Sequence, residues 1–310
     1  MRGRGTAAAK IGVVLVNYGG EQDTLQCLDS LRAQVGVDLN AIVVDNTPAD
    51  NMSRHSIAYP EMTLLRRGRN LGFAAGTNVG IQHALAADCD SLFLVNNDTV
   101  MDSDCLALLL ECSLSHPEAA IIAPAIYRES DRNSPWFTGS SLDWATAAAI
   151  HETRDVKALG METPFAIPWA TGCAMLIPSR AIRELGGFDE RYFCYYEDVD
   201  LSLRAADKGY SCLLCPRAVL YHKVGASVVK HGQIQSYYDT RNRFLCFSTH
   251  SSDSIREPAM RSLRRLAFKT ARRSLLKANW PEERRKAMAV ILGAYDFHRR
   301  RFGECPYSFV

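Results

Sequence analysis

The sequence predicts an α/β protein with a mostly parallel central sheet, followed by a helical C-terminal extension. Two observations predict this class. Buried runs rich in β-branched residues alternate with helical patterns until about Lys230, and beyond that point only helical patterns remain. The 310 residues are 47% hydrophobic and 23% charged. This composition allows a large core and excludes a collagen-like, disordered or small disulfide-bonded chain.

The first part of the chain carries the clearest alternation. Expected strands at 11–17, 41–45, 62–65 and 91–95 are separated by helical patterns at 24–33 and, after a glycine-rich turn, at about 75–87. Three of these strands end in polar residues, namely Asn17, Asp45 and the triplet Asn96–Asp98. Because ligands bind beyond the carboxyl ends of parallel strands, these residues predict a binding site.

The middle of the chain is less regular. Residues 128–168 contain turn residues and the aromatic side chains Trp136, Phe137 and Trp144, and we expect loops or short strands that cover the site. Further elements are expected as an apolar run at 171–177, helices at 179–185 (with Ser179 near its cap) and 199–208, and short strands at 213–214 and 219–221.

The net charge of +2 conceals an uneven distribution. Residues 256–301 contain 14 Lys or Arg and 4 Asp or Glu, a net charge of +10, which leaves −8 for the rest. Residues 261–277 combine an apolar helical stripe with a basic surface. This pattern fits a subdomain that packs on the acidic body, or a helix that lies on anionic lipid. No nucleic-acid partner is expected, because no recognition motif accompanies the charge.

The cysteines and termini indicate a cytosolic protein. Among ten scattered cysteines, Cys212 and Cys215 form a lone CxxC motif, and a zinc site usually needs a second pair. We therefore expect buried, reduced thiols. The first ten residues lack the apolar run of a signal peptide, and no window approaches the ~20 apolar residues of a membrane-spanning helix.

Two strand ends offer oxygen ligands. Asn96, Asn97 and Asp98 could hold a hard divalent cation, although Asn and Asp also favour turns for local reasons. Asp45 could accept hydrogen bonds from a nucleobase or a ribose, or it could simply be the turn residue before Pro48. Each pattern alone leaves both interpretations open.

The glycine-rich segment at 69–80 (RNLGFAAGTNVG) spaces its glycines by four residues from Gly72. Glycines allow close backbone approach, and a helix N-terminus favours anions. The segment matches neither the GxGxxG pattern nor a P-loop, which disfavours a Rossmann dinucleotide site. Asn70 and Asn78 add amide groups that a merely structural turn would not need.

Residues 192–200 (YFCYYEDVD) place aromatic residues before Glu197 and Asp198 at an expected helix start. Acidic residues at the start of a helix interact favourably with the helix dipole, which is one explanation for them. Two adjacent carboxylates beside an aromatic wall could also supply a general base. His222 lies on a strand-like run. It is either structural or a metal ligand, if the fold returns it to Asp98.

Seven motifs together resemble the family 2 glycosyltransferases with a GT-A fold, particularly the rhamnosyltransferase-like branch. In chain order they are VNY (16–18), VVDN (43–46), NLGFAAGTNVG (70–80), NND (96–98), TGCAML (171–176), GGFDERYFCYYEDVDL (186–201) and HKVGAS (222–227). The likeness covers about residues 11–230, with a weaker echo in YYDTRN (237–242). It implies a catalytic domain at 1–230, whose acceptor part is 128–230, and a basic helical extension at 231–310.

The resemblance also implies roles for individual residues. NND stands in the place of the family's DxD motif, with Asn96 replacing its first Asp, so Asp98 and His222 would hold Mg²⁺ or Mn²⁺. Asp198 would be the catalytic base, paired with Glu197. The predicted donor-binding residues are Asn17, Tyr18, Asp45, Asn70, Gly72, Asn78, Asn96 and Asn97. The predicted acceptor-binding residues are Trp169, Gly172, Tyr196, Tyr238 and Arg241.

The expected function is therefore metal-dependent, inverting transfer of a sugar from a nucleotide diphosphate sugar. A dTDP-linked deoxysugar such as L-rhamnose is the first choice of donor, and a UDP- or GDP-hexose is the alternative. A sugar nucleotidyltransferase is the rival class, but GGEQDT after Tyr18 lacks its basic loop. The acceptor could be a glycan, a lipid-linked saccharide or a small molecule. This expected function is compatible with a homodimer. It is also compatible with contact between residues 256–301 and the inner face of the membrane.

Overall fold

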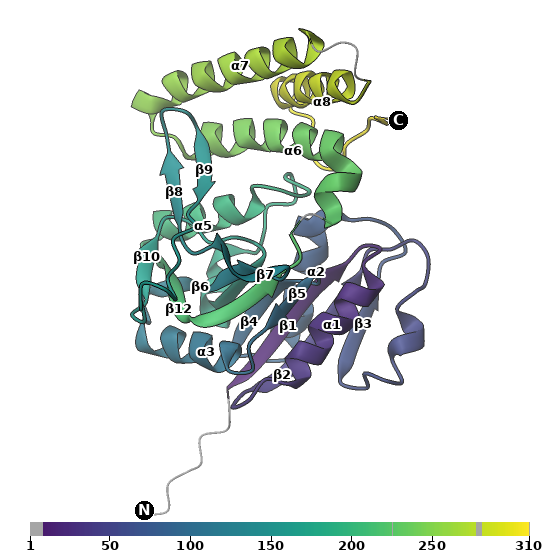
Figure 1. The fold of residues 1–310 in the computed structure, drawn as a ribbon, viewed down its shortest axis with the longest axis vertical. Coiled ribbons are helices and arrows are strands. Elements are labelled where there is room, and N and C mark those ends of the chain that lie inside the picture. The colour runs from purple at the N-terminus through teal and green to yellow at the C-terminus, as the bar shows by residue number, and fades with distance from the viewer. Residues whose placement is uncertain (1–8, 225, 277–280, 310) are drawn as a thin grey trace, which may run out of the picture.

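The computed structural model describes residues 9–224, 226–276 and 281–309 (Figure 1). Most of the first ten residues, where no signal peptide is expected, lie outside this range. The same is true of Lys277, the last residue of the predicted basic helix, and of residue 225 within the HKVGAS motif. No helix in the described ranges is long and apolar enough to span a membrane.

The first half of the chain forms the parallel part of a ten-stranded sheet, as predicted. Its strands are β1 (Lys10–Asn17), β2 (Asp38–Asp45), β3 (Met62–Arg66) and β4 (Ser91–Asn96), and β1 lies between β2 and β4. The helical segments are α1 (Glu21–Arg32), η1 (Ser53–His55), α2 (Gly72–Ala86) and α3 (Cys105–Ser115). Strands β1, β2 and β4 are largely buried because each has a neighbour on both sides, whereas β3 forms the edge of the sheet and is only partly buried.

The second half of the sheet is mixed. Its strands are β5 (Thr99–Met101), β6 (Ala119–Arg128), β7 (Asp131–Phe137), β10 (Phe165–Ile167), β11 (Ala174–Pro178) and β12 (Ser211–His222), and β8 (Ser140–Asp143) and β9 (Ala148–His151) form a separate hairpin. The main path runs β10-β12-β6-β11-β4-β1-β2-β3, and four of its seven neighbouring pairs are parallel. Strand β11 is antiparallel to both β4 and β6.

Several local predictions need correction. The two short strands expected near 213–221 are the single strand β12, interrupted by an irregularity between Cys215 and Val219. Helix α4 (Ser179–Leu185) forms as expected, but the Ser179 hydroxyl donates to the Cys89 carbonyl (2.5 Å) instead of capping the helix. Cys212 and Cys215 are buried and free.

Helix α2 begins at Gly72, so the expected glycine-rich turn is in fact the first part of this helix. A Cβ on Gly80 would lie 2.2 Å from Val14 Cγ1, and one on Gly76 would lie 2.8 Å from Asn46 Nδ2. The four-residue spacing therefore lets α2 approach β1 closely. This packing explains Gly76 and Gly80 without a bound anion.

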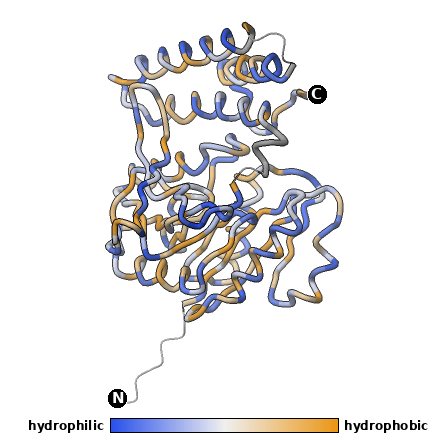
Figure 2. The backbone as a smooth tube through the Cα atoms, viewed as in Figure 1, coloured by the Kyte–Doolittle hydropathy of each residue, from blue (hydrophilic) through white to orange (hydrophobic). Residues whose placement is uncertain are grey.

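The C-terminal extension consists of α6 (Ala226–His250), α7 (Asp253–Leu276) and α8 (Pro281–His298), which confirms its predicted helical character. Helices α7 and α8 lie on the side of α6 away from the sheet (Figure 1). Hydrophobic and hydrophilic positions intermix along α7 and α8, as Figure 2 shows. The domain boundary proposed at 230/231 falls inside α6.

Candidate active site

The carboxyl ends of β1, β2 and β4 meet at one edge of the sheet. Asn17 pairs in register with Asp45, and the side-chain amide of Asn17 (Nδ2) donates to Asp45 Oδ1 (2.8 Å). Asp45 is completely buried, and its Oδ2 has no hydrogen-bond partner within the described protein. An unpaired buried carboxylate oxygen is costly unless a ligand satisfies it. Tyr18 is 57% exposed beside this edge, so the predicted donor residues Asn17, Tyr18 and Asp45 come together.

Three other predicted donor residues have structural partners. Asn97 Nδ2 donates to Thr24 Oγ1 (2.8 Å) at the start of α1. Asn70 Oδ1 accepts from the Gly72 amide (2.9 Å), just where α2 begins. Asn78 exchanges hydrogen bonds with the backbone of Phe188, at 2.9 Å in each direction. Asn97 and Asn78 each join segments that are distant in the chain, whereas Asn70 bonds within the turn that begins α2. Asn70 and Asn78 therefore do have structural contacts, contrary to the interpretation that a structural turn would not need their amides.

Gly72 also has a packing requirement. Its φ is +81°, and a Cβ there would lie 2.6 Å from the Phe193 ring and from the Phe193 carbonyl oxygen. The Ala74 amide donates to that same carbonyl (3.1 Å). The start of α2 is therefore joined to the loop that precedes Glu197 and Asp198.

Asp98 and His222 lie together, as the resemblance implied. Antiparallel pairing of β5 with β12 sets His222 opposite Thr99, and His222 Nε2 lies 3.2 Å from Asp98 Oδ1. Both side chains are mostly buried, and His222 Nδ1 has no hydrogen-bond partner among the residues that the structure describes. Burial lowers the pKa of His222, but neighbouring Cys173 and Asp98 more than offset this and raise it to about 10.

These two side chains suit a divalent cation that takes its other ligands from a substrate. A carboxylate oxygen and an imidazole nitrogen are established ligands of such ions. No group of three or more His, Cys, Asp or Glu capable of holding a metal occurs among the described residues. The protein alone therefore offers an incomplete set of ligands, which oxygen atoms of a diphosphate and water would complete.

Glu197 and Asp198 begin α5 (Glu197–Asp207). Asp198 Oδ2 accepts from the Gly172 amide and Oδ1 accepts from the Val199 amide, both at 2.8 Å. A Cβ on Gly172 would lie 3.3 Å from Asp198 Cβ, so this position favours glycine. Gly172 is thus a positioning contact for the carboxylate, in addition to its predicted place in the acceptor region.

The segment containing Gly172 also connects the two acidic centres. The amide of Asn96 donates to the Cys173 carbonyl (2.8 Å), which places the NND triplet next to this segment. The charges of both Asp98 and Asp198 act on the Cys173 thiol. The fold therefore brings the metal-ligand candidates and the candidate base to one place, although they are 100 residues apart.

The acidic pair is strongly perturbed. Burial, followed by the charge of Asp198, raises the pKa of Glu197 well above its ordinary value, and Glu197 Oε2 has no hydrogen-bond partner. Burial also raises the pKa of Asp198, although the amides of Gly172 and Val199 oppose the shift. A raised carboxyl pKa is a common property of catalytic acids and bases.

The loop before this pair adopts a demanding conformation. Phe193, Tyr195 and Tyr196 all have positive φ, between 65° and 72°, which non-glycine residues rarely adopt. Asn242 Nδ2 donates to the carbonyl oxygens of Tyr192, Cys194 and Tyr195 at 2.7–2.8 Å.

Arg241 supports the same loop from a fully buried position. Its guanidinium donates to the carbonyl oxygens of Arg191, Tyr192 and Gly303, and to Asn242 Oδ1, at 2.7–3.1 Å. This corrects the acceptor-binding role predicted for Arg241, because its donors are engaged inside the protein. Tyr238 is likewise buried, and its ring stacks on Phe193 (5.2 Å). Tyr196 is only partly buried at the start of α5.

An aromatic cluster lies beside the metal-ligand candidates. Trp136 contacts both His222 (4.6 Å between ring centres) and His151 (4.7 Å), and His151 also contacts Trp169 (5.2 Å). Burial lowers the pKa of His151 to about 4, so this imidazole is neutral at physiological pH. Trp169 is 3% exposed, so its ring lies beneath the surface of the candidate site. Sequence reasoning missed His151, because no local motif surrounds it.

The fold and this site define a glycosyltransferase of the GT-A class. Residues 92–274 match the model of the family "Glycosyl transferase family group 2", and the chain belongs to this family.

Similar proteins agree with this assignment. The dTDP-rhamnosyl transferase RfbF of Shigella flexneri is 23% identical over 97% of this chain and 99% of its own. The N-acetylglucosaminyl-diphospho-decaprenol L-rhamnosyltransferase of Mycobacterium tuberculosis is 28% identical over 68% of this chain and 75% of its own. A mannosyltransferase of Pyrobaculum calidifontis, in complex with GDP-Man and Mn²⁺, has a similar fold, with a TM-score of 0.59 at 14% identity over 96% of this chain and 89% of its own.

Proposed function

We propose that this enzyme transfers a deoxysugar, with L-rhamnose from dTDP-rhamnose as the leading candidate, to an acceptor hydroxyl with inversion at the anomeric carbon. One observation carries the proposal: Asp198, a partly buried carboxylate of raised pKa, is joined through Gly172 and Cys173 to the Asp98–His222 pair. The rhamnosyltransferases similar to this chain support the choice of donor. A UDP- or GDP-hexose is the alternative.

The donor would occupy the edge formed by β1, β2 and β4. The unpaired Asp45 Oδ2 suits a hydrogen-bond donor such as the ring N–H of a pyrimidine base, while Asn17 holds the other carboxylate oxygen in place. Asn96 and Asp98 follow on the adjacent strand, where the diphosphate would lie. Asp98 and His222 would hold Mg²⁺ or Mn²⁺, which supplies positive charge against the leaving diphosphate.

Asp198 would act as the base in a direct displacement. The acceptor oxygen forms a bond to the anomeric carbon as the bond from that carbon to the diphosphate oxygen breaks. The acceptor proton goes to Asp198, and the nucleoside diphosphate leaves. Because a single displacement occurs on the face opposite the leaving group, the anomeric configuration inverts. Glu197 lies deeper, and we assign it the role of maintaining the environment of Asp198.

The acceptor would enter beside Trp136 and Tyr196, within residues 128–230 of the proposed catalytic domain 1–230. A lipid-linked saccharide is the acceptor class that best suits the basic extension at 231–310, whereas a glycan or a small molecule would not need it. We place the enzyme in the cytoplasm, at the inner face of the membrane. A homodimer is compatible with this arrangement.

The proposal is tested with a panel of dTDP-, UDP- and GDP-sugars in the presence of Mn²⁺, followed by nucleotide release and mass spectrometry of the products. Release of dTDP with a rhamnosylated product is expected. Turnover with only a UDP- or GDP-hexose would replace the donor assignment, and pyrophosphate release would identify a nucleotidyltransferase.

A calorimetric experiment tests the metal site independently of turnover. Asp98→Ala should weaken donor binding in the presence of Mn²⁺, because the carboxylate that shares the ion with the diphosphate is lost. Without Mn²⁺, the variant and the wild type should bind the donor alike. Asp102→Ala, which removes another acid just beyond β5, is the control. Equal Mn²⁺ dependence in the wild type and Asp98→Ala would contradict the assignment.

A further inference from the structure

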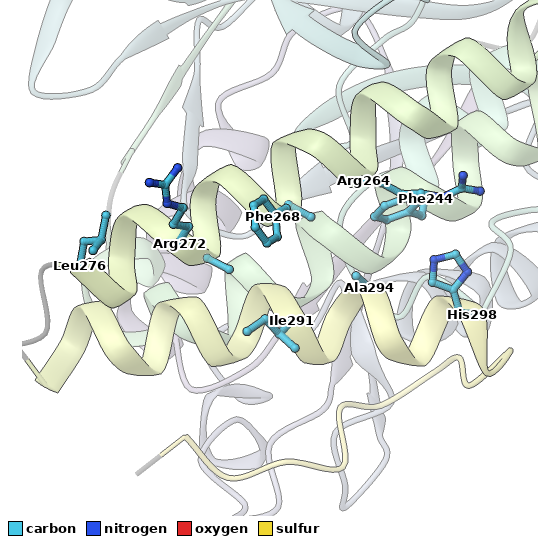
Figure 3. A pocket seen from close by; sticks show the side chains of 10 residues that line it. Phe244, Arg264, Phe268, Arg272, Leu276, Ile291, Ala294 and His298 are labelled. Carbon is cyan, nitrogen blue, oxygen red and sulfur yellow. The ribbon is translucent and has the colours of Figure 1, made fainter.

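A groove of about 490 Å³ lies between α7 and α8, with its inner end at α6 (Figure 3). Phe268 and Leu276 of α7, Ile291 of α8 and Phe244 of α6 line its apolar part, and Arg264 and Arg272 of α7 lie at its sides. The groove is far from the strand ends that form the candidate active site, because α6 lies between the two (Figure 1).

The apolar side chains of the groove are unusually accessible. Phe268 is 71% exposed and Leu276 is 75% exposed, while Ile291 is 44% exposed. Leu266 and Met288, on the same two helices, are exposed as well. Scattered single apolar residues are common on protein surfaces, but a contiguous patch with a groove marks a binding surface.

The groove is positively charged. Helix α7 carries seven Lys or Arg and two Asp or Glu, and none of the described residues that line the groove is acidic. Arg264 has a single long contact with Glu257 (3.4 Å) in an exposed position. Arg272 makes no hydrogen bond or ion pair with any described residue. The partner that covers this surface therefore needs negative charge and apolar groups together.

We propose that the α7–α8 groove docks the enzyme on a bilayer that contains anionic phospholipids. Phe268, Leu276 and Ile291 enter the boundary between headgroups and acyl chains, and Arg264 and Arg272 meet the lipid phosphates. This inference deepens the proposed function, because a lipid-linked acceptor would be held at the same membrane.

Two other occupants fit less well. A second copy bound through the same face would bring the arginines of both α7 helices together, with no acidic residue in the groove to pair with them. A nucleic acid would pair with the arginines but would leave aliphatic Leu276 and Ile291 without an apolar partner. A bilayer of anionic phospholipids supplies negative phosphate and hydrocarbon side by side along a single helix face.

The test is co-sedimentation of the full chain with phosphatidylcholine vesicles, prepared with and without phosphatidylglycerol, and with no sugar present. The wild type should bind only the anionic vesicles, and less at high salt. Phe268→Ser combined with Leu276→Ser, and separately Arg264→Gln combined with Arg272→Gln, should each weaken binding about tenfold or more. Leu159→Ser and Lys208→Gln, which change exposed residues of the catalytic body, are matched controls that should bind like the wild type.

Failure of binding by the wild type, or equal binding by the wild type and both double variants, would overturn the proposal. Light scattering that shows a dimer dissociated by the Phe268 and Leu276 changes, without vesicle binding, would assign the groove to a second copy. Binding of DNA or RNA but not vesicles would assign it to nucleic acid. Because no donor is used, the outcome is independent of the nucleotide-sugar panel.

Discussion

In the loop at 192–196, backbone carbonyls accept hydrogen bonds from the buried side chains of Arg241 and Asn242. In the α7–α8 groove, by contrast, Arg264 and Arg272 lie beside exposed Phe268. The guanidinium of Arg241 and the side-chain amide of Asn242 donate to acceptors inside the protein. In the α7–α8 groove, Arg272 has no partner among the described residues, Arg264 has an exposed contact with Glu257, and Phe268 is largely exposed.

The difference separates two uses of the same C-terminal extension. Groups that are satisfied internally hold a conformation, here the positive-φ loop that presents Asp198. Groups left unsatisfied at the surface are available to bind something outside the chain. The helical extension therefore contributes to positioning through α6, and we propose that it contributes to membrane docking through α7 and α8.

The largest expected effect lies at the residue that the loop presents. Asp198→Asn should lower kcat by about 10²–10⁴-fold, because the amide cannot accept the acceptor proton. Donor binding measured by calorimetry should persist, since Asp45 and Asp98 are unchanged. Asp207→Asn, at the exposed end of the same helix, is the control and should keep full activity. Turnover of Asp198→Asn near the wild-type rate would exclude Asp198 as the base.

A smaller effect is expected when the support of the loop is removed. Asn242→Ala removes a donor that three backbone carbonyls share, of which that of Tyr192 keeps Arg241, and should lower the free energy of unfolding by about 1–3 kcal/mol. It should also lower kcat about tenfold, through loss of Asp198 orientation, with little change in donor affinity. Urea unfolding and steady-state kinetics measure the two effects.

Ser248→Ala serves as the control for Asn242, because the Ser248 hydroxyl bonds only within α6, to the Leu245 carbonyl. It should leave kcat unchanged. If Asn242→Ala lowered stability but left kcat unchanged, the hydrogen bonds from Asn242 to the loop would be purely structural. The proposed link between α6 and catalysis would then be wrong.

The pH dependence of activity tests the buried environment that the fold gives to Asp198. Asp198 accepts a proton only when it is ionised, and burial raises its pKa. Activity should therefore fall as the pH decreases through a value above about 4, where an exposed aspartate titrates. Burial and the charge of Asp198 keep Glu197 protonated in this range, so Glu197→Gln replaces one neutral group by another and should leave this acid limb in place. The profile of kcat/KM at saturating Mn²⁺ measures the limb, and a shift to lower pH in the variant would show that Glu197 is ionised beside Asp198.

The smallest effect on stability and activity is expected for a substitution in the α7–α8 groove. Phe268→Ser changes a largely exposed ring, so the free energy of unfolding should stay within about 0.5 kcal/mol of the wild type. Activity on an acceptor free in solution should also be unchanged. Thermal unfolding and kinetics test this expectation. A large loss of stability would mean that Phe268 belongs to the core of the helical extension.

Local patterns were sufficient for the parallel half of the fold. The buried runs of β1, β2 and β4 placed Asn17, Asp45 and Asn96–Asp98 at one edge, because adjacent parallel strands end together. The approach of His222 to Asp98 needed the family resemblance, since 124 residues separate them in the sequence. The sequence did not reveal the structural contacts of Gly76, Asn78 and Arg241, because their partners are distant in the chain.

The sequence by itself therefore determined the fold class, the edge of the sheet that carries the site and the acidic residues at its centre. Hydrophobic periodicity and strand-end chemistry are local properties that the order of residues records directly. Only the tertiary structure decided that Arg241 and Asn242 hold the loop, that Gly172 fixes Asp198 and that α7 leaves its apolar and cationic groups uncovered. Backbone carbonyls are the same in every residue, so their use as acceptors, like the burial of a helix face, depends on which segments the fold brings together.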